Sequence, residues 1–237
     1  MSKDDEEQPL DPIASARRSH RPPREKVWGA ILNKPPGFVS TRKEANPRQR
    51  PSVYECLPQG WDTAERPLGH FGRLDFESSG LLLFSDDGLL QQGLLNPSFR
   101  HTLSKGYDLK PVEKVYHVKT PQTVDAATLE SLRAPLVMGG HQASRVIETL
   151  PAHVELLESS ADGTWLSFTI TEGRNRQIRR LCARSRLDVE VLRRVQLGPL
   201  VLDGLEEGKA RPLTQDEMQQ CYDWSLPGVP VPRVMPF

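Results

Sequence analysis

The chain has 237 residues, of which 37% are hydrophobic and 26% are charged, and its formal net charge at pH 7 is +0. This composition is typical of a soluble globular protein, and the lack of a run of about 18–20 apolar residues argues against a membrane-spanning helix. The acidic start MSKDDEEQPL lacks the apolar core of a signal peptide, and the three cysteines show no CxxC spacing. We therefore expect a cytoplasmic protein without a disulfide framework.

We expect both ends of the chain to form tails. Residues 1–25 are polar and contain four prolines, with acidic residues gathered before residue 12 and basic residues after it. The final PGVPVPRVMPF has too many prolines for a helix or a central strand. The predicted organisation is a disordered tail over residues 1–25, one folded domain over residues 26–222 and an extended tail over residues 223–237.

The region between the tails mixes short strands with a few helices. Alternating or continuous apolar residues predict strands over residues 27–33, 81–85, 114–120, 153–159, 164–170 and 190–197. Helical patterns predict helices over residues 88–95, 125–133, 177–187 and 215–220, the last beginning at the capping box TQDE. Strands in succession with occasional helices favour an α+β domain, built on a mixed and largely antiparallel sheet flanked by helices.

The segment GRLDFESSG, residues 72–80, leads into the apolar run LLLF, which we expect to be a central strand. A carboxylate at the mouth of a buried strand needs a hydrogen-bonding or cationic partner to remain ionised, and this makes Asp75 a candidate functional residue. An ordinary turn or cap residue would fit the same pattern. Glu77 could in principle act with it as an acid–base pair, but no feature of the sequence fixes the separation that such a pair requires.

Arginine is concentrated in a second segment. Residues 171–194 hold eight arginines, three acidic residues and no lysine. This suits phosphate binding, although a salt-bridged helix surface would have the same composition. Apolar spacing at positions 178, 181, 182 and 185 puts Arg179 at the edge of a buried helix face, so we predict that Arg179 pairs with Asp75. Its stem could alternatively just cover the core.

Four motifs, in order, resemble those of pseudouridine synthases. GRLDFESSGLLLFSDDG resembles the catalytic signature of the family, and LNKPPGFVST, KVYHV and EGRNRQIRRLC resemble its flanking motifs. The resemblance covers about residues 27–213 and is strongest to the branch that modifies ribosomal RNA, which holds the small-ribosomal-subunit synthase A and the large-ribosomal-subunit synthases B, E and F. Many of these carry an S4-type RNA-binding domain, for which the polar start of this chain is too short. We therefore expect a single-domain member with the pseudouridine synthase fold that acts on large-subunit RNA.

The resemblance implies an isomerisation of uridine in ribosomal RNA, in which the N1–C1′ bond breaks and the uracil rejoins the sugar through C5. It implies that Asp75 is the catalytic carboxylate, either attacking C1′ or removing the C2′ proton. It further implies that Arg179 pairs with Asp75 and that the ring of Tyr116 stacks on the target base. No metal or redox cofactor is expected, which agrees with histidines that lack metal-ligand spacing.

The target base must leave its stack to be reached, so the RNA contacts also matter. The resemblance implies that Arg73 fills the space of the flipped base and that Arg174 and Arg176 hold phosphates. The expected partner is ribosomal RNA or a pre-ribosomal particle, with the enzyme as a monomer. A non-catalytic RNA-binding or ribosome-assembly factor is the main alternative, and a nucleoside or glycoside hydrolase, which would require a second carboxylate, ranks below it.

Overall fold

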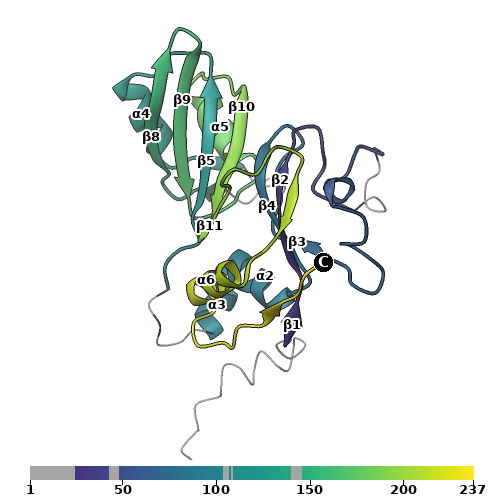
Figure 1. Ribbon diagram of the computed structural model, residues 1–237. Coiled ribbons are helices and arrows are strands. Elements are labelled where there is room, and N and C mark those ends of the chain that lie inside the picture. Colours follow the sequence, from purple (N-terminus) through teal and green to yellow (C-terminus); the bar gives the residue numbers. More distant parts are fainter. Residues whose placement is uncertain (1–24, 43–47, 104–106, 108, 140–145) are drawn as a thin grey trace, which may run out of the picture.

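Figure 1 shows a computed structural model of the protein, which describes residues 25–42, 48–103, 107, 109–139 and 146–237. Within these ranges no helix has both the length and the apolar character needed to cross a membrane. The predicted tail over residues 1–25 falls almost wholly outside them.

A nine-stranded sheet forms the centre of the described molecule, in the order β12-β2-β4-β10-β5-β9-β8, with β3 beside β4 and β11 beside β10. Its strands are β2 (Gly29–Lys34), β3 (Gly69–His70), β4 (Ser79–Ser85), β5 (Lys114–Thr120), β8 (His153–Ser160), β9 (Gly163–Ile170), β10 (Val191–Leu197), β11 (Leu200–Val201) and β12 (Ala210–Pro212). Only β4 and β10 pair in parallel; the other neighbouring strands are antiparallel. This arrangement confirms the predicted α+β class.

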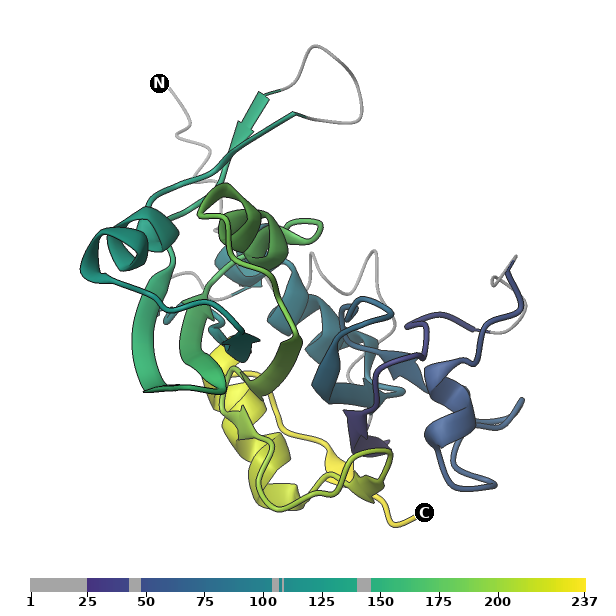
Figure 2. The same ribbon diagram turned by 90° about the horizontal axis from the view of Figure 1, so that it is seen from above.

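The helices gather at two parts of the sheet. They are α2 (Gly88–Leu95), α3 (Pro97–Leu103), α4 (Ala126–Arg133), α5 (Gln177–Arg184) and α6 (Gln215–Ser225), with a 3-10 helix η2 (Val53–Cys56). Helices α4 and α5 lie against the β5, β8, β9 and β10 half, whereas α2, α3 and α6 lie by the half containing β2 and β4 (Figure 1). The view from above places η2 on the opposite side of the molecule from α4 (Figure 2).

Strand β4 is buried on both faces and divides the core. Its side chains at Leu82 and Phe84 pack in the cluster that contains α5, whereas Leu81 and Leu83 pack in the cluster that contains α2 and α6. A strand buried on both faces is apolar without alternation, which explains the run LLLF. The segment around Asp75 is therefore anchored to a strand that is buried along its whole length.

The chain forms regular structure in part of the segment expected to be an extended tail. Helix α6 continues to Ser225, and β13 (Arg233–Val234) pairs in parallel with β1 (Lys26–Val27). The ring of Phe237 stacks on Trp61 with centroids 4.0 Å apart. Proline is compatible with such an edge position because it lacks only a donor that an edge strand need not use. A further hairpin is formed by β6 (Val137–Gly139) and β7 (Val146–Glu148).

Candidate active site

Asp75 lies in a tight turn just before β4. The Ser78 amide donates to the carbonyl of Asp75 at 3.0 Å, and the Gly37 amide donates to the carbonyl of Phe76 at 2.7 Å. Gly72 enters the turn with φ +69°, a conformation that side chains with a Cβ rarely adopt. These bonds hold the Asp75 carboxylate at the end of a rigid strand, as a functional group requires.

The end of β2 and the loop after it form hydrogen bonds with this turn. The Lys34 ammonium is fully buried and donates to the carbonyl oxygens of Ser78 at 2.6 Å and Pro35 at 2.9 Å. Ser40 Oγ donates to the Leu74 carbonyl at 2.9 Å and accepts from the Leu74 amide at 3.2 Å. Both ends of the Asp75 turn are thus bonded to the NKPPGFVS segment, which gives that motif a structural reason.

Burial lowers the pKa of Lys34 from 10.5 to about 8, although the Asp75 carboxylate is among the groups that act in the opposite direction. Between these two pH values the unfolded chain holds the Lys34 proton more tightly than the folded chain does. The contribution of Lys34 to the free energy of unfolding therefore rises as the pH increases through this window.

We expect this contribution to appear as a difference between the wild type and Lys34→Met. The free energy of unfolding of the wild type, relative to the variant, should rise by roughly 2–3 kcal/mol between pH 7.5 and 10.5, as measured by urea denaturation. Tyr222 and the buried cysteines, whose pKa values are raised, also affect alkaline stability, but both proteins contain them. A difference that stayed constant with pH would contradict the lowered pKa.

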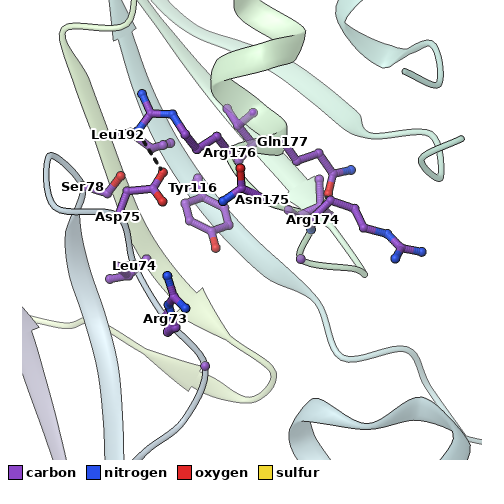
Figure 3. Close-up of a pocket in the computed structure, with 14 residues that line it drawn as sticks. Arg73, Leu74, Asp75, Ser78, Tyr116, Arg174, Asn175, Arg176, Gln177 and Leu192 are labelled. Carbon is purple, nitrogen blue, oxygen red and sulfur yellow. Dashed lines mark hydrogen bonds and ion pairs between the residues drawn. The ribbon is translucent and has the colours of Figure 1, made fainter. Parts of the chain in front are cut away.

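A cavity of about 380 Å³ opens above the Asp75 turn. Its walls come from the 72–78 segment, from Tyr116 on β5, from Ile170 at the end of β9, from the 173–178 segment and from Leu192 on β10. Figure 3 shows the Asp75 carboxylate directed toward Arg176, with the Tyr116 ring beside them. Tyr116 and Leu192 are 9% and 6% exposed, so they form an apolar floor next to the carboxylate.

In the described part of the molecule, Arg176 forms an ion pair with Asp75. Its Nη1 lies 3.7 Å from Asp75 Oδ2 and donates to Glu77 Oε2 at 3.0 Å, and this hydrogen bond is the main reason that the pKa of Glu77 is lowered. Arg176 precedes α5 in a left-handed conformation, with φ 52° and ψ 33°. This backbone conformation changes the direction of the chain just before α5, and the Arg176 side chain extends across the cavity toward Asp75.

The predicted pairing of Asp75 with Arg179 is therefore corrected. Among the described residues Arg179 pairs with Glu77, with Nε 3.8 Å from Oε2, and its terminal nitrogens lie 3.4 Å from the carbonyl oxygens of Glu77 and Val189. The predicted helix face is otherwise as expected, since Ile178, Leu181 and Cys182 are buried. Arg179 is one turn deeper in α5 than Arg176, so it reaches the backbone of the turn instead of the Asp75 carboxylate.

The other predicted site residues surround the same cavity. Arg73 lies at the far side of Leu74 from Asp75, and the Arg174 guanidinium points away from the carboxylate (Figure 3). Sequence reasoning missed the parts played by Leu192 and by Gln177, which is buried and accepts from the Arg174 amide at 3.1 Å through Oε1. No local pattern distinguishes these two from ordinary core and helix residues. In the part of the chain that is described, no cluster of three or more histidine, cysteine or acidic side chains could hold a metal ion.

Known proteins similar to this chain are described as pseudouridine synthases. The Haemophilus influenzae ribosomal small subunit pseudouridine synthase A is 32% identical over 194 residues, which cover 80% of this chain and 72% of that protein. The Pseudomonas aeruginosa ribosomal large subunit pseudouridine synthase B is 31% identical over 79% of this chain, which spans only 44% of that relative. A crystal structure of a pseudouridylate synthase matches with a TM-score of 0.65 and 30% identity, over 84% of this chain and 75% of the other.

The family model described as RNA pseudouridylate synthase matches residues 29–184, which include the Asp75 turn, β5 and α5. That span is more than half of the chain. The fold seen here is accordingly the pseudouridine synthase fold. The chain belongs to the RNA pseudouridylate synthase family, whose members are isomerases.

Proposed function

We propose that this protein converts a specific uridine of large-subunit ribosomal RNA into pseudouridine, with Asp75 as the catalytic carboxylate. The observation that carries the proposal is the cavity in which the Asp75 carboxylate, the Tyr116 ring and the Arg176 guanidinium converge. The apolar floor suits a flipped base, and the carboxylate at its edge suits the sugar. As a finer assignment we propose the type of ribosomal large subunit pseudouridine synthase E, on the resemblance of the four motifs.

The reaction needs only an ionised carboxylate and a place for the uracil to turn. Asp75 either adds to C1′ or takes the C2′ proton, and the N1–C1′ bond breaks with its electrons going to the uracil. After rotation C5 bonds to C1′, either as the Asp75–C1′ ester bond breaks or as Asp75 returns the proton to C2′, so the Asp75 carboxylate is regenerated. The C5 hydrogen then leaves as a proton, and N1 gains a proton. Substrate and product are isomers, so no oxidant or reductant is consumed.

The remaining site residues have separate parts in this proposal. Tyr116 stacks on the uracil, Arg176 holds the Asp75 carboxylate in direction, and Arg179 positions the turn through the Glu77 carbonyl. Arg73 occupies the space that the base leaves in the RNA, since a planar guanidinium can stack there and also bond to phosphate. Arg174 holds a phosphate beside the target.

The proposal is tested with RNA transcribed from [5-³H]uridine, because formation of the C5–C1′ bond releases the label to water. We expect the purified protein to release tritium from large-subunit RNA, or from a large-subunit precursor particle, to a plateau equivalent to a single uridine. Small-subunit RNA is the matched control and should release none. Release only from small-subunit RNA would overturn the assignment of the target while leaving the isomerase activity in place. Binding to both RNAs and particles without any release would favour the assembly-factor alternative.

Arg176 and Arg179 should fail in different ways when each is replaced by methionine. Arg176 is 43% exposed in its side chain, so Arg176→Met should leave the melting temperature almost unchanged but slow single-turnover tritium release by roughly 10- to 100-fold. Arg179 is 13% exposed and joins α5 to the Asp75 turn, so Arg179→Met should lower the free energy of unfolding by about 1–2 kcal/mol. The reverse result, with the larger catalytic loss and no loss of stability at Arg179, would restore the pairing expected from the sequence.

A further inference from the structure

A second cavity, of about 590 Å³, adjoins the active-site cavity. Gly173 and Arg174 line both of them. Leu95 lies at the boundary, since its Cδ2 is 3.5 Å from the position that a Cβ on Gly72 would take. Lys114 lines the second cavity and Tyr116 the first, two residues apart on the same face of β5. A polymer whose target residue occupied the first cavity would pass directly into the second.

The apolar side chains in the walls of this cavity come from separate segments. Leu95 is the last residue of α2 and Pro97 the first of α3. Leu109 and Pro111 belong to the segment before β5, and Leu150 follows β7. Leu95 and Leu150 are 37% and 54% exposed. Solvent-exposed leucines around one opening indicate a binding surface, and apolar side chains on two sides can hold the faces of a nucleobase.

A lysine without a hydrogen-bonding partner points to an anionic ligand. Within the described residues the Lys114 ammonium makes no hydrogen bond or ion pair, yet it is partly buried in the cavity wall. Burial lowers its pKa to about 8, the nearby Arg194 acts in the same direction, and Glu172 acts against both. A partly desolvated ammonium of this kind would be stabilised by a charge-assisted hydrogen bond to a phosphate oxygen.

Glu172 accepts hydrogen bonds from three residues at the border between the two cavities. Its Oε1 accepts from the Leu150 amide at 2.7 Å and from Gln177 Nε2 at 3.0 Å, and its Oε2 accepts from Arg174 Nε at 2.9 Å. Both carboxylate oxygens of Glu172 therefore accept hydrogen bonds from the protein, and one of these bonds holds Arg174 where the two cavities meet. The terminal nitrogens of Arg174 make no hydrogen bond within the described part of the chain, and its side chain is 46% exposed.

We propose that the second cavity is a subsite for an RNA nucleotide next to the target uridine, with its base between the apolar walls and its phosphate bound by Lys114 and Arg174. This inference rests on the proposed function, because it takes the first cavity as the site of the uridine. It adds a means of recognising the sequence or shape of the RNA around the target. A subsite of this kind would contribute to finding the substrate from within the catalytic domain itself.

The test compares Lys114→Met and Leu150→Trp with the wild type on large-subunit RNA labelled with [5-³H]uridine. Each variant should raise the enzyme concentration for half-maximal single-turnover release by about 10-fold, with the maximal rate within about 3-fold of the wild type. Leu156→Trp on β8 is the matched control, since Leu156 is 47% exposed and lines neither cavity, and it should behave as the wild type.

Direct RNA binding gives two readouts that a purely structural role of Lys114 would not change. Lys114→Met should reduce the slope of log affinity against log salt by about 0.7, the value for one phosphate contact on a single strand, whereas Leu150→Trp should leave the slope unchanged. Wild-type affinity should also fall as the pH rises from 7 to 9, and Lys114→Arg should reduce this fall because arginine keeps its charge. Lys34, whose pKa is also lowered to about 8, lines neither cavity and is the same in both proteins. Arg100, Glu148, Glu172 and Arg174 also line this cavity, and the buried Arg194 acts on Lys114 through its charge. The reference pKa values of glutamate and arginine side chains lie outside pH 7–9.

Each outcome decides one of the two claims. If the wild type releases tritium and both cavity variants match it in half-maximal concentration and salt slope, the subsite is wrong and the isomerase proposal stands. If the wild type releases none from any ribosomal RNA, the proposed function fails. In that case an unchanged salt slope for Lys114→Met would overturn the phosphate contact as well.

Discussion

Asp75→Asn is expected to reduce single-turnover tritium release by at least about 10⁴-fold, to the background of RNA alone. Asparagine has nearly the same shape, and the bonds that hold the turn are made by the backbone of residues 75–78, by Lys34 and by Gly37. The substitution therefore removes the negative charge and the attacking oxygen but keeps the geometry. RNA affinity and the melting temperature should stay close to the wild-type values, because Asp75 is 30% exposed in its side chain and faces the cavity.

Glu77→Gln is the matched control for this experiment. Glu77 is a carboxylate two residues away that binds the same Arg176 more closely, at 3.0 Å. It lines neither cavity, so its loss should slow release by less than about 10-fold, through a less ordered Arg176. An equal loss in both variants would indicate that the pair of carboxylates and Arg176 act together. Substantial activity in Asp75→Asn would exclude Asp75 as the catalytic carboxylate.

Elements with a strong local pattern were predictable, and short ones were not. Helix α2 and strand β5 have the predicted bounds, since the first follows the turn DDG and the second alternates buried and partly exposed residues. Asp87 of that turn also caps α2 and accepts from the hydroxyl of Tyr222 at 2.6 Å. The paired strands of two or three residues, such as β3 and β13, are too short for any periodicity to appear.

The arginine segment shows why composition identifies a region but not the part that each residue plays. Arg194 is 2% exposed, and its Nε donates to the Leu81 carbonyl at 2.8 Å. Its side chain therefore helps to hold β10 to β4 within the sheet. Arg184 donates to the carbonyl oxygens of Ala134 at 2.9 Å and Pro135 at 2.6 Å, beyond the end of α4, where free carbonyls favour a cation. Arg174 and Arg176 line the active-site cavity. These differences depend on tertiary contacts that charge counts do not contain.

The Asp75 pairing failed as a prediction for a backbone reason. Helical periodicity favoured Arg179 because it lies at the edge of a buried face, and that position is correct. Periodicity describes only residues inside the helix, however, whereas Arg176 precedes α5 with a positive φ. A left-handed conformation at a residue other than glycine is uncommon and is not visible in the sequence. The pattern therefore identified the right segment and the wrong arginine.

Gly80→Ala is expected to have the largest effect on stability, with a loss of at least about 4 kcal/mol in the free energy of unfolding. Gly80 has φ +105°, and a Cβ at this position would lie 2.6 Å from the amide nitrogen of Arg194 and closer still to its carbonyl oxygen. Both of these atoms belong to the backbone of β10, so a change of rotamer cannot relieve the overlap. Thermal unfolding should show a decrease of roughly 8–16 °C or more in melting temperature.

The cost is large because the overlap falls on the parallel contact between β4 and β10. Arg194 pairs with Gly80 and Arg193 with Ser79 there, and this contact joins the strands β2 and β4 to the strands β5, β8 and β9. Gly88→Ala is the matched control. Among the described residues, and apart from its chain neighbours and the backbone of its own helix, no atom lies within 4 Å of its Cβ position. Its φ is not positive and it begins α2, so alanine should be neutral or slightly stabilising there. A loss of less than about 1 kcal/mol at Gly80 would mean that the two strands can separate without cost. Since Gly80 follows the Asp75 turn by only five residues, any Gly80→Ala protein that remains folded should also lose tritium release.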